Sequence, residues 1–157
     1  MEPYKAKQIG GEIFTEKRKV TGEFIALINL TLESRGLKLI TPFSRVVLKN
    51  EIHEVMLTDE QDASPGKTVN RVSILGFFEV KTGGIIVVGD EALIEKTVIG
   101  EVAGFDVTHM PNHMGIIVKA RKLYNTLIKL GSKITFLSEK SSNVKGLTKV
   151  KKYDSKE

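Results

Sequence analysis

Two of the three histidines in this 157-residue chain, His109 and His113, lie only four positions apart. They belong to the stretch 104–115, GFDVTHMPNHMG, which holds the densest group of side chains suited to chemistry. An imidazole titrates near neutral pH and can act as a general acid or a general base. Asp106 could orient such an imidazole. We therefore predict His109, His113 and Asp106 as the catalytic residues if the protein is an enzyme.

Three further side chains are predicted to bind the ligand. Thr108 and Asn112 lie in the same stretch and add hydrogen-bond donors and acceptors. His53 lies in a short apolar segment, on the face of Val55 and Leu57 if that segment is a strand. A histidine on an apolar face also fits a hydrogen-bonded core residue, and that alternative stays open for His53.

The spacing of the two histidines raises a metal site as an alternative. Residues i and i+4 share one face of a helix and can chelate a metal there. Pro111 lies between His109 and His113, however, and disfavours a helix through them. A third and fourth ligand would have to come from distant carboxylates or from His53. The cofactor stays unknown, and a divalent metal on His109 and His113 is not the favoured interpretation.

The same stretch also fits a purely structural turn. If residues 101–108 form a strand, Asp106 and His109 point to opposite faces unless the chain turns at Thr108. In this alternative, backbone groups cap His109 and His113 is exposed to solvent.

The segments that must position these residues are short, often rich in Val and Ile, and separated by glycine or turn residues. Strand-like runs are expected at 23–28, 36–40, 45–48, 52–57, 72–80, 85–88, 92–94, 97–107, 115–118 and 133–137. Eight of the 14 glycines lie between Gly66 and Gly115, which suits turns and bulges in a curved sheet. We predict a mainly β (α+β) single-domain protein, a small β-barrel or sandwich rather than a βαβ fold.

One amphipathic helix is predicted near the C-terminal end, over residues 119–130. Its apolar residues recur at helical spacing, at Ala120, Leu123, Leu127 and Leu130. Gly131 follows and would end the helix in the left-handed conformation that glycine tolerates.

The stretch 83–94, GGIIVVGDEALI, is interpreted as a strand, a Gly-Asp turn and a returning strand. Together with residues 98–105, it is similar to a hairpin in the β-barrel domain of translation elongation factors. The resemblance implies a small barrel, with Asp90 and Glu91 exposed in the turn.

The composition excludes several function classes. The chain has no cysteine, which excludes a disulfide framework, a thiolate nucleophile and a cysteine-ligated zinc. The phosphate-binding loop motif ending at Lys67 lacks its first glycine, because Gln61 stands there. No apolar run approaches the ~18 residues needed to cross a bilayer, and the first residues lack the order of a signal peptide. We therefore expect a cytoplasmic protein that does not associate with membranes.

The formal net charge of +5 is concentrated at one end of the chain. Residues 140–157 contain six lysines and two acids, which gives +4 and leaves +1 for the other 139 residues. We predict a single β-rich domain over 1–139 and a basic, flexible tail over 140–157.

Three functions stay open. The favoured one is small-molecule binding, or a small enzyme, that uses the 104–115 stretch. The second is a nucleic-acid-binding barrel that uses the basic helix and the lysine-rich tail, although the near-neutral body and low aromatic content argue against it. The third is a structural homo-oligomer formed where exposed strand edges pair.

Overall fold

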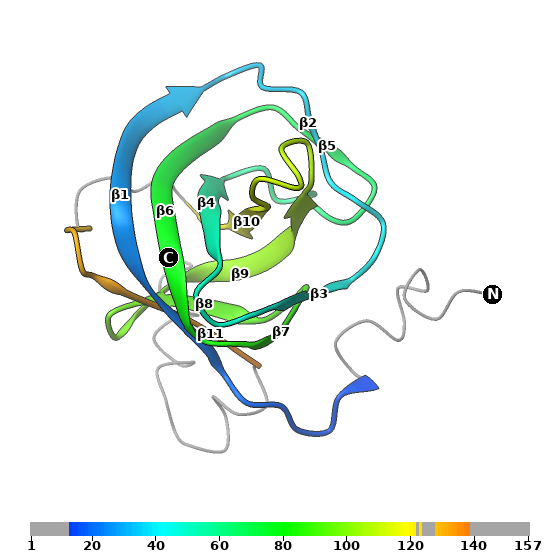
Figure 1. Cartoon of the computed structure of the whole chain (residues 1–157). Coiled ribbons are helices and arrows are strands. Elements are labelled where there is room, and N and C mark those ends of the chain that lie inside the picture. The colour runs from blue at the N-terminus through cyan, green and yellow to red at the C-terminus, as the bar shows by residue number, and fades with distance from the viewer. Residues whose placement is uncertain (1–12, 122, 124–127, 139–157) are drawn as a thin grey trace.

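A computed structural model of the chain describes residues 13–121, 123 and 128–138, and strands make up nearly all of its regular secondary structure (Figure 1). The eleven strands are β1 (Val20–Leu32), β2 (Leu37–Lys38), β3 (Ser44–Val47), β4 (Ile52–Thr58), β5 (Thr68–Val69), β6 (Val72–Thr82), β7 (Gly84–Val87), β8 (Glu91–Ile94), β9 (Thr97–Asp106), β10 (Gly115–Lys119) and β11 (Lys133–Leu137). The prediction of a mainly β single domain is confirmed.

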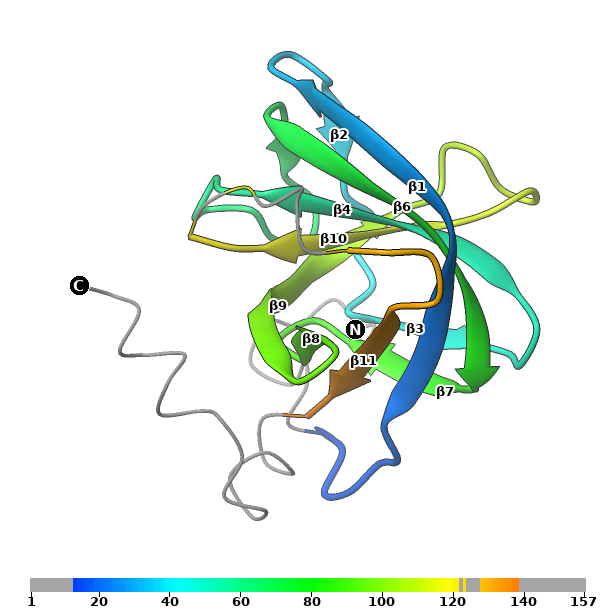
Figure 2. The same cartoon turned by 90° about the vertical axis from the view of Figure 1, so that its left-hand side faces the viewer.

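Seven of the strands close into a barrel, so the barrel and not the sandwich is the architecture (Figures 1 and 2). Their order is β1–β11–β8–β9–β10–β4–β6, and β6 pairs back onto β1. Neighbouring strands are antiparallel except for β10 and β4, which are parallel. Two small sheets, β2–β5 and β3–β7, are added to the barrel.

Alternation along the strands fills the barrel with apolar side chains. On β6, Phe78 and Val80 are buried in the core, while the intervening Glu79 lies on the outside. The largest core side chains are four phenylalanines, Phe24, Phe78, Phe105 and Phe136. Each contributes about 2–3 kcal/mol by leaving water, so these rings are a main source of stability.

A second apolar cluster lies on the outer wall, where the β2–β5 sheet covers part of the barrel. It joins Leu37, Leu39 and Val69 to Met56 and Ile117 of the wall. Gly104 permits this close packing, because a Cβ there would lie 2.8 Å from Leu39 Cδ1.

Glycines set the curvature of the barrel, as the sequence predicts. Gly76 has a φ of 150°, and a Cβ at this position would collide with the carbonyl oxygen of Ala26 on β1. The pairing of β1 with β6 shifts register on both sides of this point. Only glycine allows the two backbones to approach so closely.

The predicted helix over 119–130 is wrong for the described residues. Lys119 ends β10, and the Ala120 amide donates to the Thr58 carbonyl at 2.8 Å, so the strand pairing continues. Ile116, Val118 and Ala120 alternate into the core, which outweighs the helical spacing of the apolar residues. Residues 122 and 124–127 lie outside the described residues, as does the predicted tail over 140–157. In the described part of the chain, no helix is long and apolar enough to cross a membrane.

The predicted exposure of Asp90 and Glu91 is also wrong. Gly89 does form the turn, with a φ of 99°, but β7 pairs with β3 rather than with β8. Both acids are buried, and Asp90 accepts hydrogen bonds from Lys17 Nζ at 2.6 Å and from the Val87 amide at 2.9 Å. Burial raises the pKa of Asp90, although Lys17 and the Val87 amide act in the opposite direction.

Candidate functional site

The candidate site starts from one row of residues across four neighbouring strands of the barrel wall. Phe77 on β6 lies opposite Glu54 on β4, Glu54 lies opposite Gly115 on β10, and Gly115 lies opposite Asp106 on β9. Residues in one such row point to the same face of a sheet. The two carboxylates and the phenyl ring therefore lie on the outer wall, with Glu54 8% and Asp106 2% exposed.

The loop between β9 and β10 turns sharply beside this row. The Met110 amide donates to the Val107 carbonyl at 3.1 Å, and the Asn112 amide donates to the His109 carbonyl at 2.8 Å. The Met110–Pro111 peptide bond is cis. Since the chain turns here, His109 no longer follows the alternation of β9, which would have placed its side chain on the face opposite Asp106.

His113 is fixed on the wall by three contacts. Its Nε2 lies 3.5 Å from Glu54 Oε1, and Asn112 Nδ2 donates to its Nδ1 at 2.9 Å. The edge of the ring meets Phe77 at a centroid distance of 4.9 Å and an angle of 80°. The side chain is 12% exposed. Because Nδ1 accepts a hydrogen bond, the proton of the neutral ring belongs on Nε2, facing Glu54.

His109 stacks on His113 and remains exposed on its other side. The ring centroids are 5.0 Å apart and the planes differ by 23°. The structural alternative expected backbone groups to cap His109 and solvent to surround His113. His109 is exposed, whereas the His113 side chain is only 12% exposed. The two histidines and Asn112 are thus brought together as the spacing suggests, with His109 as the outermost ring.

Asp106 belongs to a separate pair. The Thr108 hydroxyl donates to Asp106 Oδ1 at 2.5 Å, and the Thr108 amide approaches the same oxygen at 3.3 Å. Within the described residues, no hydrogen bond connects Asp106 to His109 or His113. In this arrangement Asp106 shapes the start of the loop and does not orient an imidazole.

His53 lies behind the wall, on the inward face of β4. Its Nδ1 accepts a hydrogen bond from the Met114 amide at 3.0 Å, and its Nε2 lies 3.0 Å from Glu51 Oε1. The residue is 7% exposed, which matches the hydrogen-bonded core alternative. Burial raises the pKa of Glu51, but hydrogen bonds from the Leu48 amide and His53, with the charges of His53 and Arg45, outweigh it and lower that pKa overall.

Sequence reasoning missed Glu54 and Phe77, both of which contact His113. Glu54 is adjacent to His53, so alternation puts it on the opposite face of the strand, toward solvent. That signal could have identified Glu54 as an outer-wall acid. Nothing in the sequence indicates that β4 pairs with β10, and this pairing is what brings Glu54 close to His113.

The wall around the loop is acidic. Three of its stretches, 50–58, 72–80 and 102–118, contain no Lys or Arg. Together they contain four acids, Glu51, Glu54, Glu79 and Asp106. Lys81 pairs with Glu79 at 3.0 Å, and the charge of Arg45 acts on Glu51. Glu54 and Asp106 form no ion pair with Lys or Arg in the part of the chain that the structure describes.

The geometry gives no support to a metal on His109 and His113. Their rings are stacked, so their nitrogens lie in nearly parallel planes rather than converging on one point. Among residues 13–121, 123 and 128–138, no group of three or more His, Asp or Glu side chains could hold a metal ion.

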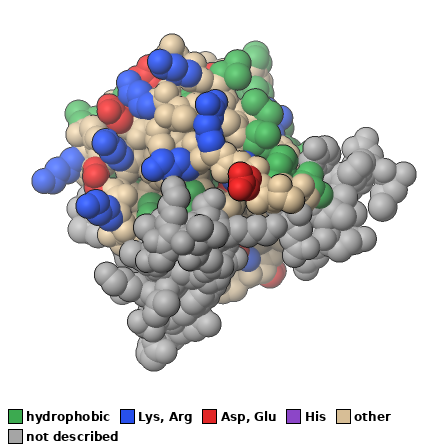
Figure 3. Space-filling view, turned by 90° about the horizontal axis from the view of Figure 1, so that it is seen from below, with side chains coloured by type: hydrophobic (Ala, Val, Ile, Leu, Met, Phe, Trp, Pro, Cys, Tyr) green, Lys and Arg blue, Asp and Glu red, His purple; other side chains and the backbone are tan. Residues whose placement is uncertain are grey.

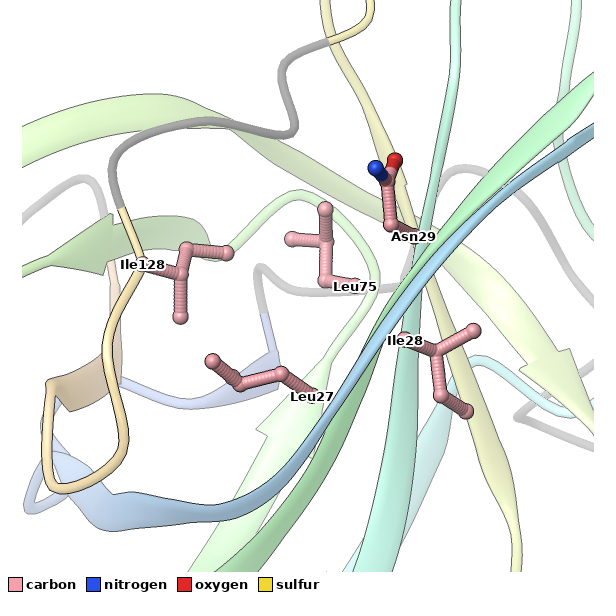
Figure 4. Close-up of a pocket in the computed structure, with 5 residues that line it drawn as sticks. All are labelled: Leu27, Ile28, Asn29, Leu75 and Ile128. Atoms are coloured by element: carbon pink, nitrogen blue, oxygen red, sulfur yellow. The ribbon is translucent and has the colours of Figure 1, made fainter.

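A small hollow of about 150 Å³ lies elsewhere, along β1. Figure 4 shows Leu27, Leu75 and Ile128 around one space, with Ile28 on the other side of the strand. Asn29 completes the lining. None of the predicted site residues lines this hollow, which is smaller than the sites that hold drug-sized ligands.

Comparison with known proteins places the chain in a family without identifying an activity. No curated protein sequence and no solved structure gives a significant match. One family model matches residues 14–137, which is well over half of the chain and includes the whole barrel. The chain therefore belongs to DUF6917, a family of unknown function.

Proposed function

We propose that the protein binds a small planar cation on the exposed face of His109. The observation that carries this proposal is the His109–His113 stack, held against Phe77 and Glu54. An exposed ring fixed from behind is a preorganised platform, so a ligand loses less entropy when it stacks there. The faces of Trp, Tyr and Phe attract cations by about 0.5–1 kcal/mol at exposed sites, and we propose that the neutral imidazole face of His109 acts in the same way.

The charge around the loop supports a cation over an anion. Glu54 and Asp106 project from the same row and have no Lys or Arg partner among the described residues. An anionic ligand would meet both carboxylates without a compensating side-chain cation. A cationic ligand gains from the negative potential of these two carboxylates, although both are buried in the wall behind the loop.

The hydrogen bonding favours binding over catalysis. Asn112 and Glu54 face the two ring nitrogens of His113, so neither nitrogen is directed at a substrate. Asp106 is engaged by Thr108 and does not orient His109. A general base normally has such an orienting partner. We therefore propose a binding role for His109, with Asn112 and Thr108 as polar groups at its edge.

Calorimetric titration with three matched probes tests the proposal. Benzamidinium, benzamide and benzoate share one ring and differ in charge. We expect benzamidinium to bind at least tenfold more tightly than benzoate, with benzamide between them. His109→Ala should weaken benzamidinium about fivefold, since it removes the stacking face.

Two variants on the wall separate the site from general electrostatics. Glu54→Gln should weaken benzamidinium, whereas Glu79→Gln, which removes an acid already paired with Lys81, should have little effect. Circular dichroism checks that each variant is folded. Equal affinity for the three probes, or equal loss in both variants, would overturn the proposal.

A further inference from the structure

Two of the most exposed aliphatic side chains lie at the end of the barrel where β3 and β7 pair. Val46 is 62% and Leu48 61% exposed. Val46 lies opposite Ile85, which is partly exposed on the same outer side, while Val47 is buried in the core. Core packing explains the inner side of this small sheet but gives no reason for aliphatic residues on its outer side.

Leu48 occupies the first position of a fixed turn. The Glu51 amide donates to the Leu48 carbonyl at 3.1 Å, and the Glu51 carboxylate accepts from the Leu48 amide at 2.9 Å. These bonds close the turn, and the backbones of Asn50 and Glu51 bond to Val80 on β6. The exposed Lys49 lies next to Leu48. The turn therefore presents an aliphatic residue and a cation together, with the Glu51 carboxylate, 41% exposed, at its end.

Gly83 brings one further cation to this turn. A Cβ on Gly83 would lie 2.7 Å from the Val47 carbonyl oxygen and 3.0 Å from the Lys49 nitrogen, so the two segments touch through their backbones. Arg18 Nε donates to the Gly83 carbonyl at 2.8 Å. Lys81, two residues before Gly83, is instead paired with Glu79 at 3.0 Å. Figure 3 shows the molecule from below, where Lys and Arg side chains are interspersed with Asp and Glu and apolar side chains lie along one edge.

We propose that this face, formed by Val46, Leu48, Ile85, Arg18 and Lys49, docks on the surface of an anionic membrane. Aliphatic side chains beside cations are the combination that lies at the boundary between acyl chains and headgroups. The cations would contact lipid phosphates, and Leu48 and Val46 would enter below them. The proposal does not depend on the ligand bound by the β9–β10 loop.

This inference differs from the expectation that the protein avoids membranes. That expectation rests on the absence of a long apolar run. A search for such runs finds only segments that span a bilayer. A peripheral face is built from residues distant in sequence, here from positions 18 to 85. A surface for single-stranded nucleic acid fits less well, because it would use aromatic side chains for stacking where this face has aliphatic ones.

Vesicle sedimentation of the full chain tests the proposal. We expect the protein to pellet with vesicles of phosphatidylcholine and phosphatidylserine, not with phosphatidylcholine alone, and to be released by high salt. Lys49→Glu should reduce the partition coefficient at least fivefold, because each basic residue near the surface contributes about that factor. Leu48→Asp and the milder Leu48→Ser should also reduce it. Lys67→Glu, in the exposed turn before β5, is the matched control and should bind like wild type.

Three results would overturn the proposal. The first is no pelleting with the anionic vesicles. The second is equal pelleting of wild type and the Leu48 and Lys49 variants, when circular dichroism shows that all are folded. The third is binding to duplex DNA that Lys49→Glu weakens and Leu48→Ser leaves unchanged, which would assign the face to nucleic acid instead.

Discussion

Replacing His53 with alanine should lower the free energy of unfolding and loosen the β9–β10 loop, although His53 does not lie at the proposed binding face. Its Nδ1 is the acceptor for the buried Met114 amide, and its ring packs near Phe78 with a centroid distance of 6.5 Å. An orphaned buried amide costs about 1–3 kcal/mol. Loss of the ring adds a cavity term, so we expect a decrease of about 3 kcal/mol in the free energy of unfolding.

Urea unfolding of His53→Ala measures the loss of stability, and amide hydrogen exchange at Met114 measures the loosening of the loop. His109→Ala is the control, because an exposed side chain outside the core should change stability by less than about 0.5 kcal/mol. Equal stability of the two variants, with unchanged protection of the Met114 amide, would refute the role given to His53.

Three more perturbations test the fold and its ion pairs. Gly76→Ala should destabilise the barrel by about 3 kcal/mol or more in urea unfolding, because the new Cβ meets backbone at a φ of 150°. Lys17→Met should cost about 3 kcal/mol at neutral pH by leaving Asp90 buried without its cation, and Asp90→Asn in the same chain should restore part of the loss. The lowered pKa of Glu51 means that its ionised form stabilises the folded state. Wild type should therefore exceed Glu51→Gln in stability above the usual glutamate range, and the difference should vanish as the pH falls through the folded pKa.

The strand content and the glycine-dependent curvature follow from local patterns, and both could be predicted. Alternation and β-branched residues act over a few neighbours, so the sequence indicates most strands near their true positions. The loop residues His109, Asn112 and His113 are close in sequence, and a turn is enough to bring them together. This is why the candidate site could be located without the fold.

The errors arise where distant segments decide the outcome. Ala120 continues the line of β10 into the core because the carbonyl of Thr58, far away in sequence, accepts its amide hydrogen bond. The buried Asp90 is paired with Lys17, and no local sequence pattern links these two residues. Glu54 reaches His113 only through the parallel pairing of β4 with β10, a long-range contact that periodicity does not encode.

The most direct test of the proposed function is a nuclear magnetic resonance titration of the three imidazole side chains with benzamidinium. The account predicts saturable shifts of the His109 and His113 signals and an unchanged His53 signal, since His53 lies behind the wall. Benzoate at the same concentrations should leave all three unchanged. Unchanged His109 and His113 signals with benzamidinium, or equal shifts with benzoate, would contradict the proposed cation site.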